Sequence, residues 1–266
     1  MIRLVIAGAT GKMGGAIIRE ILDSSADIQI VGAIASRGSS KKGQDVGKLA
    51  GVRSLGVPVL SDISGTTFDV MVDFSRPEAL QQNLAVCVQQ GSAIIIGTTG
   101  LNADQNRLIS EAADSIPVLF AANTSVGVNL CAALVEMAAR VLGQISDIEI
   151  IEAHHRYKVD APSGTALLLG EAAAAGIEAD FPDCGVFSRE GHTGERKKGI
   201  IGFSTIRGGN IAGEHTVMFI GENERIEITH RATDRKIFAQ GAVRGAIWLA
   251  QQEKGLFSMQ DVLDLR

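Results

Sequence analysis

The stretch Gly8-Ala9-Thr10-Gly11-Lys12-Met13-Gly14 decides the fold class of this chain. It follows residues 3–7, an apolar run that predicts a buried strand, and it opens residues 13–24, whose apolar periodicity predicts a helix. Glycines between a strand and a helix let the backbone approach a pyrophosphate, and the helix N-terminus favours that negative charge. The spacing is G-x-x-G-x-x-G rather than G-x-G-x-x-G, so a plain strand-to-helix turn is the alternative interpretation. The predicted contacts of a dinucleotide in this loop are Gly8, Ala9, Thr10, Gly11, Lys12 and Met13.

Short apolar runs alternate with helical segments through the first half of the chain. The strands predicted after the glycine loop are residues 28–35, 70–73, 93–96 and 118–121, and helices over residues 76–90 and 103–115 separate the last three. Continuous runs such as Ile94-Ile95-Ile96 are typical of parallel strands that are buried on both faces. This half therefore predicts a Rossmann-like parallel sheet.

The pattern changes from about residue 127. Helices are predicted over residues 129–143 and 166–175, with a strand over residues 147–153 between them. Residues 200–207, 215–221 and 224–231 alternate apolar and polar side chains, which is typical of antiparallel strands with one solvated face. An apolar helix is predicted over residues 237–251. We expect an α/β protein in which residues 1–125 and 235–266 form a dinucleotide-binding domain, and residues 126–234 form an inserted α+β domain with a mostly antiparallel sheet.

Composition excludes several classes of protein. Glycine is abundant, at 31 of 266 residues, but proline is scarce, at 5, which indicates tight turns rather than flexible linkers. The net charge of −5 gives no reason to expect nucleic-acid binding, and no run approaches the length of a membrane span. Cys87, Cys131 and Cys184 are odd in number and far apart, so we expect a reducing cytoplasm rather than a disulfide framework.

The end of the second predicted strand bears on the choice of cofactor. Sites that prefer NAD carry an acidic residue about 20 positions after the loop, whereas an Arg accommodates the 2′-phosphate of NADP. Here Ser36-Arg37 stands at that place, which favours NADPH over NADH. Asp73-Phe74-Ser75 and Gly97-Thr98-Thr99-Gly100 follow two further strands, and they either line the rest of the cofactor site or simply form turns.

A dense group of basic side chains lies between a predicted strand and a predicted helix. Residues 152–165 include His154, His155, Arg156 and Lys158. The imidazole of His154 exchanges protons near neutral pH, and Lys158 supplies a cation or a proton. Hydrogen-bonded interior residues or a surface loop are the alternative interpretation of this group.

The start of the following helix predicts a site for a carboxylate. Gly164 and Thr165 would present helix N-terminal amides to it, with Ser163 or Asp160 as the capping residue. We predict no metal site, because adjacent histidines on a strand point to opposite faces and no third ligand stands at a recognisable spacing.

These motifs resemble those of the 4-hydroxy-tetrahydrodipicolinate reductases, which belong to diaminopimelate and lysine biosynthesis. The resemblance runs nearly end to end. It rests on the glycine loop, Asp73-Phe74-Ser75, residues 97–100 and Ala122-Asn123-Thr124-Ser125, and most specifically on residues 152–156 with Lys158, residues 160–165, residues 189–196 and residues 213–216.

The resemblance implies NADPH- or NADH-dependent reduction of a cyclic dicarboxylate, 4-hydroxy-tetrahydrodipicolinate, to tetrahydrodipicolinate with loss of water. It implies that His154 and Lys158 are the catalytic acid–base pair, and that His155, Gly164 and Thr165 bind the substrate. It also implies a homotetramer built through the sheets of the second domain, which would be a substrate-binding and tetramerisation domain. This chain departs from members that carry Glu or Asp at the position of Ser36, which again favours NADPH. The cofactor contacts implied beyond the glycine loop are Ser36, Arg37, Gly97, Thr98, Thr99, Ala121, Ala122, Asn123 and Thr124.

Two other functions fit parts of the pattern. One is another two-domain NAD(P)H oxidoreductase of amino-acid metabolism that acts on a different acid. The other is a sensor that binds NADPH without catalysis, although a sensor has no need of the proton donors His154 and Lys158.

Overall fold

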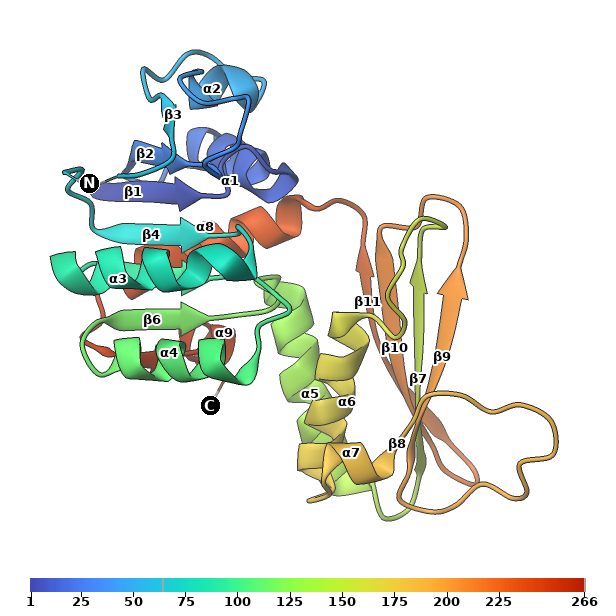
Figure 1. Cartoon of the computed structure of the whole chain (residues 1–266). Helices are drawn as coiled ribbons and strands as arrows, with labels where there is room; N and C mark the ends of the chain where they lie inside the picture. The colour runs from blue at the N-terminus through green and yellow to red at the C-terminus, as the bar shows by residue number, and fades with distance from the viewer. Residues whose placement is uncertain (64, 266) are drawn as a thin grey trace. The chain divides into compact units, whose positions relative to one another are not determined.

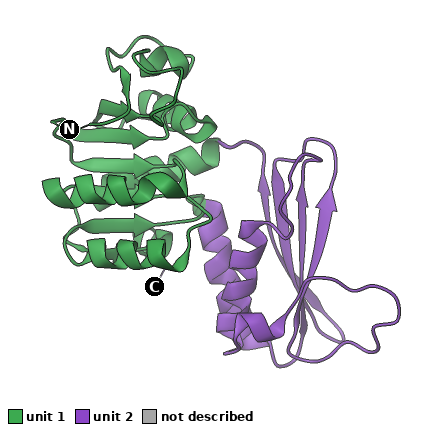
Figure 2. Ribbon diagram, in the orientation of Figure 1, with its two compact units in different colours: residues 1–126, 236–264, 266 green, residues 127–235, 265 purple. Residues whose placement is uncertain are grey.

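A computed structural model describes residues 1–63 and 65–265 of the chain. Contacts divide it into two compact units, which Figure 2 shows in different colours. Unit 1 contains Met1–Val126 and Lys236–Asp264, and unit 2 contains Gly127–Arg235. Unit 1 is therefore formed from two stretches of sequence that are separated by unit 2.

Unit 1 is built on a parallel sheet (Figure 1). Its strand order, β12-β6-β5-β4-β1-β2-β3, contains the doubly wound order 3-2-1-4-5-6, and every pair in it is parallel. The chain reverses its direction of winding between β1 and β4, and a ligand is expected at that switch point. The strands are β1 (Ile2–Ala7), β2 (Ile28–Ile34), β3 (Val59–Leu60), β4 (Val70–Asp73), β5 (Ala93–Ile96), β6 (Pro117–Phe120) and β12 (Gly255–Phe257).

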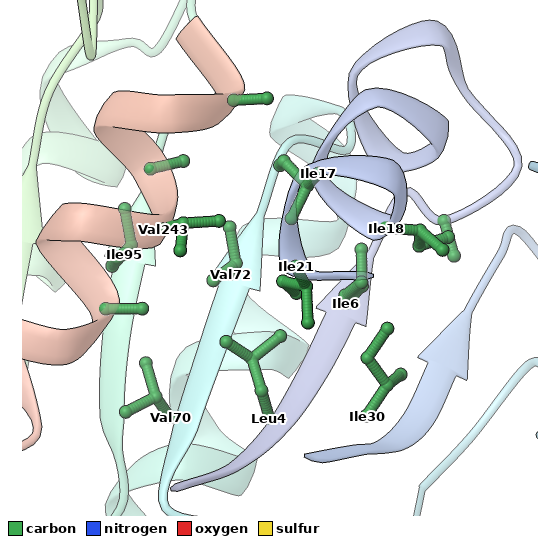
Figure 3. Close-up of a cluster of buried hydrophobic side chains, with 14 of the residues drawn as sticks. Leu4, Ile6, Ile17, Ile18, Ile21, Ile30, Val70, Val72, Ile95 and Val243 are labelled. Atoms are coloured by element: carbon green, nitrogen blue, oxygen red, sulfur yellow. The ribbon is translucent and has the colours of Figure 1, made fainter. Parts of the chain in front are cut away.

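Helices cover both faces of this sheet, which is why its strands are apolar throughout. Along β1, Leu4 and Ile6 face the core under α1 and α8, whereas Val5 and Ala7 face the core under α3 and α4. Figure 3 shows the first of these cores. The helices of unit 1 are α1 (Lys12–Asp23), α2 (Val46–Leu49), α3 (Leu80–Gln90), α4 (Ala103–Ala113), α8 (Lys236–Leu249) and α9 (Met259–Val262), with a 3₁₀ turn at Pro77–Ala79.

Unit 2 packs helices against a mixed sheet with the order β11-β10-β7-β9-β8. Its core lies between the sheet and the helices, and contains Ile148 and Ile150 of β7 together with Val217 and Phe219 of β10. The elements are α5 (Val126–Leu142), β7 (Asp147–His154), α6 (Gly164–Gly176), α7 (Phe181–Cys184), β8 (Gly185–Val186), β9 (Ile201–Arg207), β10 (Gly213–Ile220) and β11 (Arg225–Ala232).

The predicted fold class is confirmed, but one strand pairs differently from the prediction. Residues 200–207 were expected to join an antiparallel group, whereas β9 runs parallel to both β7 and β8. The reason is the connection, because α6 lies between β7 and β9 and returns the chain to the same end of the sheet. The pairs β11–β10 and β10–β7 are antiparallel, as expected.

Several element boundaries also differ from the prediction. The helix expected over residues 129–143 begins earlier, at Val126, and the one expected over residues 76–90 starts as a 3₁₀ turn because Pro77 lies in its first turn. The sequence patterns did not predict the short elements α2, β3, α7, β8, β12 and α9. Within the described residues, no helix is long and apolar enough to cross a membrane.

The packing of α8 predicts the effect of one substitution in unit 1. A methyl group on Gly241 would overlap the carbonyl oxygen of Thr124, whose hydroxyl donates to Phe238 O at 2.7 Å. We expect Gly241→Ala to lower the free energy of unfolding by about 2 kcal/mol, since backbone atoms must move to admit the methyl group. The measurement is the urea midpoint of the full chain. The control is Gly38→Ala, where the new Cβ would meet no described heavy atom within 4 Å; equal midpoints for the two variants would contradict the prediction.

Candidate active site

The turn after β1 requires glycine at its first position. Gly8 has a φ of 78°, and the amides of Gly8 and Ala9 both donate to Ile34 O, at 3.0 and 3.1 Å. A Cβ on Gly8 would overlap the backbone carbonyl of Phe74, which follows β4. The turn therefore brings the ends of β1, β2 and β4 into close contact at the switch point of the sheet.

The start of α1 suits an anion. Its N-cap residue is Gly11, which has no side chain to accept a hydrogen bond from the first amides of the helix. A Cβ on Gly14 would lie 2.6 Å from Gly8 O, so glycine there permits the helix to approach the turn closely. Exposed amides at a helix N-terminus, held close to a strand end, fit the pyrophosphate of a dinucleotide.

A cavity of about 660 Å³ lies beside this turn, entirely within unit 1. Of the predicted cofactor residues, the structure brings five together in its lining: Gly8, Thr10, Gly11, Ser36 and Arg37. Other predicted residues lie elsewhere in the described chain: Ala9 is buried beneath the turn, Lys12 and Met13 begin α1, residues 97–99 follow β5, and residues 121–124 follow β6. Polar residues that the sequence reading did not select also line the cavity, namely Ser61, Asp62, Arg76, Glu78, Gln82 and Asn83.

A buried carboxylate organises the strand ends next to the cavity. Asp73 is fully buried and accepts hydrogen bonds from the Ser75 amide at 2.8 Å, the Ser75 hydroxyl at 2.5 Å and the Asn83 amide at 2.8 Å. The Thr98 hydroxyl donates to the same carboxylate at 3.2 Å. Asp73 thus joins the ends of β4 and β5 to α3, a role that turn-forming composition alone did not reveal.

In unit 2, a second buried carboxylate contacts His154. Nδ1 of His154 lies 2.6 Å from Oε2 of Glu152, whose side chain is 1% exposed. The guanidinium of Arg207, at the end of β9, donates to both oxygens of this carboxylate at 2.8 Å. A bidentate hydrogen-bonded pair with a guanidinium is a geometry that stabilises a buried carboxylate strongly.

Burial and charge set the protonation of this pair. Burial on its own would raise the pKa of Glu152, but the hydrogen bonds from Arg207 and His154 hold that pKa below its usual value. Burial lowers the pKa of His154, although Glu152 acts in the opposite direction. The site therefore holds an ionised carboxylate and, at neutral pH, a neutral imidazole. An ionised carboxylate only accepts, so Nδ1 of His154 carries the hydrogen and Nε2 keeps a lone pair.

Lys158 lies on the loop between β7 and α6, with its side chain 19% exposed. Its ammonium donates to both oxygens of Asp160, at 2.8 and 2.7 Å, and lowers the pKa of that carboxyl. Arg207 also donates to the backbone oxygen of Asp160 at 2.7 Å. Arg207 thereby connects the Lys158 loop to the Glu152–His154 pair.

The start of α6 meets the same cluster. The N-cap residue is Ser163 and not Asp160, the other residue predicted for this role. The hydroxyl of Ser163 accepts a hydrogen bond from the Ala166 amide at 3.2 Å. Oγ of Ser163 also lies 2.8 Å from Nε2 of His215. The sequence patterns predicted no specific role for His215. A Cβ on Gly164 would meet no heavy atom of the described residues within 4 Å, so a ligand has room to approach the backbone there.

His155 directly follows the last residue of β7. Its ring lies 6.3 Å from the ring of Tyr157, which is strongly exposed. Nδ1 of His155 has no hydrogen-bond partner within the described residues.

The architecture of unit 1 is that of dinucleotide-dependent oxidoreductases: a doubly wound sheet with a glycine turn at its switch point. Residues 2–124 match the family described as dihydrodipicolinate reductase, N-terminus, and residues 127–263 match dihydrodipicolinate reductase, C-terminus. The chain is 51% identical over 268 residues to the 4-hydroxy-tetrahydrodipicolinate reductase of Pseudomonas fluorescens, with 100% of both sequences covered. The chain belongs to the dihydrodipicolinate reductase family, which confirms the resemblance predicted from its motifs.

Solved structures share the fold. A dipicolinate-bound dihydrodipicolinate reductase from Paenisporosarcina sp. TG-14 superposes with a TM-score of 0.75 at 24% identity, covering 98% of each chain. An amine dehydrogenase from Mycobacterium smegmatis gives a TM-score of 0.58 at 15% identity, covering 97% of this chain and 95% of the other.

The environment of His215 predicts how stability depends on pH. Burial, followed by the charge of His154, lowers the pKa of His215 from 6.5 to about 4. The unfolded chain therefore binds a proton there that the folded chain does not, and stability decreases as pH falls from 6.5 towards 4. We expect wild type to lose roughly 2 kcal/mol from this group between about pH 7 and about pH 5, and His215→Gln to lose less over that interval.

The measurement is the free energy of unfolding in urea at the two pH values. The control is His192→Gln, in an exposed loop of the same unit, which should keep the pH dependence of wild type. An equal pH dependence in the His215 and His192 variants would contradict the assignment.

Proposed function

We propose that this chain catalyses the reduction of 4-hydroxy-tetrahydrodipicolinate to tetrahydrodipicolinate in lysine biosynthesis, with a reduced nicotinamide cofactor as hydride donor and with release of water. The observation that carries the proposal is its 51% identity, over the whole length, with a 4-hydroxy-tetrahydrodipicolinate reductase. The basic cluster around His154 at the start of α6 supports it, because that cluster suits an anionic substrate that must receive a proton.

The turn after β1 binds the cofactor in this proposal. Gly8 and Gly14 let the turn pack closely against the end of β4 and the start of α1, and the first amides of α1 face the charge of the pyrophosphate. When bound, the dihydronicotinamide supplies the hydride. Ser36 places no carboxylate beside the adenosine ribose, and Arg37 lines the cavity, so NADPH is preferred and NADH is also accepted. The proposed contacts are Gly8, Ala9, Thr10, Gly11, Lys12, Met13, Ser36, Arg37, Gly97, Thr98, Thr99, Ala121, Ala122, Asn123 and Thr124.

Unit 2 binds the substrate in this proposal. The substrate carries two carboxylates, and the positive end of the α6 dipole at Gly164 and Thr165 favours one of them. His155 completes this subsite. The relative from Paenisporosarcina is described as dipicolinate-bound, and dipicolinate is a planar dicarboxylate of the same kind.

His154 and Lys158 form the acid–base pair. As the hydride arrives, negative charge develops on the ring of the substrate, and a nearby proton stabilises it. Nε2 of His154 and Nζ of Lys158 both exchange protons, and each is held by a carboxylate, Glu152 and Asp160 respectively. Ionised partners keep both groups oriented between turnovers.

We place the enzyme in the cytoplasm, where the three unpaired cysteines stay reduced. We further propose a homotetramer assembled through the sheet of unit 2. The sheet face opposite the helices carries the apolar side chains Ile151, Met218 and Ile206, and Ile206 is 49% exposed. Such side chains favour burial against another copy of the chain.

The test of the function is turnover by the purified chain. The substrate is made in the assay by condensing pyruvate with aspartate semialdehyde, and oxidation of NADPH is followed by absorbance. We expect turnover that requires both precursors. An enzyme that binds NADPH tightly but shows no turnover would contradict the proposal and favour the sensor.

The same assay, applied to a variant of Lys158, tests whether this residue takes part in proton transfer. Lys158→Ala should lower kcat by about a hundredfold or more while the affinity for NADPH changes little, since the lysine acts in proton transfer and not on the cofactor. Lys198→Ala, which removes an exposed lysine from a loop of the same unit, should retain wild-type turnover. Near-normal kcat in the Lys158 variant would remove this residue from the mechanism.

The cofactor preference depends on Arg37. We expect a lower KM for NADPH than for NADH, and a rise of about tenfold in the KM for NADPH in Arg37→Ala, because a charge-assisted hydrogen bond to the 2′-phosphate is lost. The KM for NADH should change little. The control is Lys42→Ala, an exposed lysine in the same loop. Equal changes for the two cofactors would show that Arg37 does not contact the 2′-phosphate.

A further inference from the structure

The carboxylate of Glu152 accepts hydrogen bonds from four different residues. Nδ1 of His154 lies 2.6 Å from it, and Arg207 donates twice at 2.8 Å. The Ser163 amide and the Thr205 hydroxyl donate at 3.1 and 3.3 Å. With its side chain 1% exposed, Glu152 is enclosed by these partners and does not reach a substrate. Its effect on a reaction must be exerted through them.

Three of these four partners lead to a residue of the proposed mechanism. His154 is two positions further along β7, so both side chains lie on the same face of the sheet. Ser163 caps α6 immediately before Gly164, where the substrate carboxylate binds in our proposal. Arg207 bonds the backbone of Asp160, and the Asp160 carboxylate holds the ammonium of Lys158.

We propose that Glu152 is the positioning residue of the active site: it fixes His154 as the tautomer with hydrogen on Nδ1, and through Ser163 and Arg207 it sets the places of the α6 start and the Lys158 loop. This inference rests on the proposed function for the roles of His154 and Lys158. The fixed tautomer itself depends only on the geometry around Glu152.

The surroundings of His154 support a fixed orientation of its ring. The ring of His215, from β10, packs edge-on against it with centroids 5.1 Å apart. A Cβ on Gly213 would lie 3.1 Å from Nε2, so the glycine leaves space beside the nitrogen that carries the lone pair. The charged and titratable groups that act on the imidazole are Glu152 from its own strand, Arg207 from β9, His215 from β10 and Lys158 from the following loop.

The chain offers a matched control on the same strand. Glu149 lies three residues before Glu152, and therefore on the opposite face of β7. It also binds a guanidinium twice, with Arg189 at 2.9 and 2.8 Å, and a second one, Arg196, at 3.0 Å. The two glutamates thus share their strand and their kind of ion pair, but only Glu152 contacts His154.

The first experiment compares Glu152→Gln with Glu149→Gln in the full chain. The amide of Gln keeps the shape of the side chain but removes its charge. We expect kcat to fall by about tenfold or more in Glu152→Gln, while the KM for NADPH stays within about twofold of wild type. Losing the negative charge favours the neutral imidazole, so the limb of the pH profile of kcat/KM that belongs to His154 should move to lower pH. Glu149→Gln should keep the kcat and the pH profile of wild type.

A second measurement needs no substrate and no change at Glu152. The ¹⁵N chemical shifts of the histidine side chains in the wild-type chain report which nitrogen carries the hydrogen, and comparison with His154→Gln assigns the signal. We expect hydrogen on Nδ1 of neutral His154. A neutral ring with hydrogen on Nε2 would overturn the proposal, and so would a Glu152→Gln variant whose kcat and pH profile match those of Glu149→Gln. Absence of turnover in wild type would instead refute the proposed function. The two failures can be told apart, because the tautomer is measured without the reaction.

Discussion

The buried negative charge of Glu152 constrains the part of unit 2 that lies around the end of β7. A carboxylate that is removed from water needs donors on every side, and these come from β9, from the start of α6 and from His154 on β7 itself. Pairing places Thr205, Glu152, His215 and His230 in one row across four strands, whereas the row two residues earlier along β7, on the same face, is apolar. This face of the sheet thus changes from apolar core to polar site within two residues of β7. The apolar row consists of Phe203, Ile150, Val217 and Ile228.

Unit 1 depends on a different feature, which is the absence of a side chain at two glycines, one in the turn after β1 and one in α1. At Gly8 and Gly14 a methyl group would collide with backbone atoms, so the turn after β1 and the start of α1 approach each other as closely as their main chains allow. In our proposal unit 1 binds its anion with amides and a helix dipole, whereas unit 2 surrounds its charged groups with charged side chains. The negative net charge of the chain is compatible with the two proposed anion sites because each would act locally.

Local signals made much of this predictable from sequence. The glycine loop and buried runs such as Ile94-Ile95-Ile96 need only a few neighbouring residues to be recognised, and the dense basic segment pointed to His154 and Lys158. What escaped prediction depends on distant parts of the chain. Arg207 stands 55 residues after Glu152 in sequence, and only the parallel pairing of β7 with β9 brings them together. The two-residue strand β3 offers too short a pattern to detect.

The position of α8 in sequence has a consequence for how the protein forms during synthesis. Residues 127–235 separate α8 from the rest of unit 1, yet it covers the sheet face that carries Val70, Val72 and Ile95. While a ribosome is producing unit 2, that apolar face is covered by α1 but not yet by α8. Unit 2, a continuous segment, has all of its residues before unit 1 does. The order of the residues along the chain therefore makes unit 1 the later of the two units to be completed.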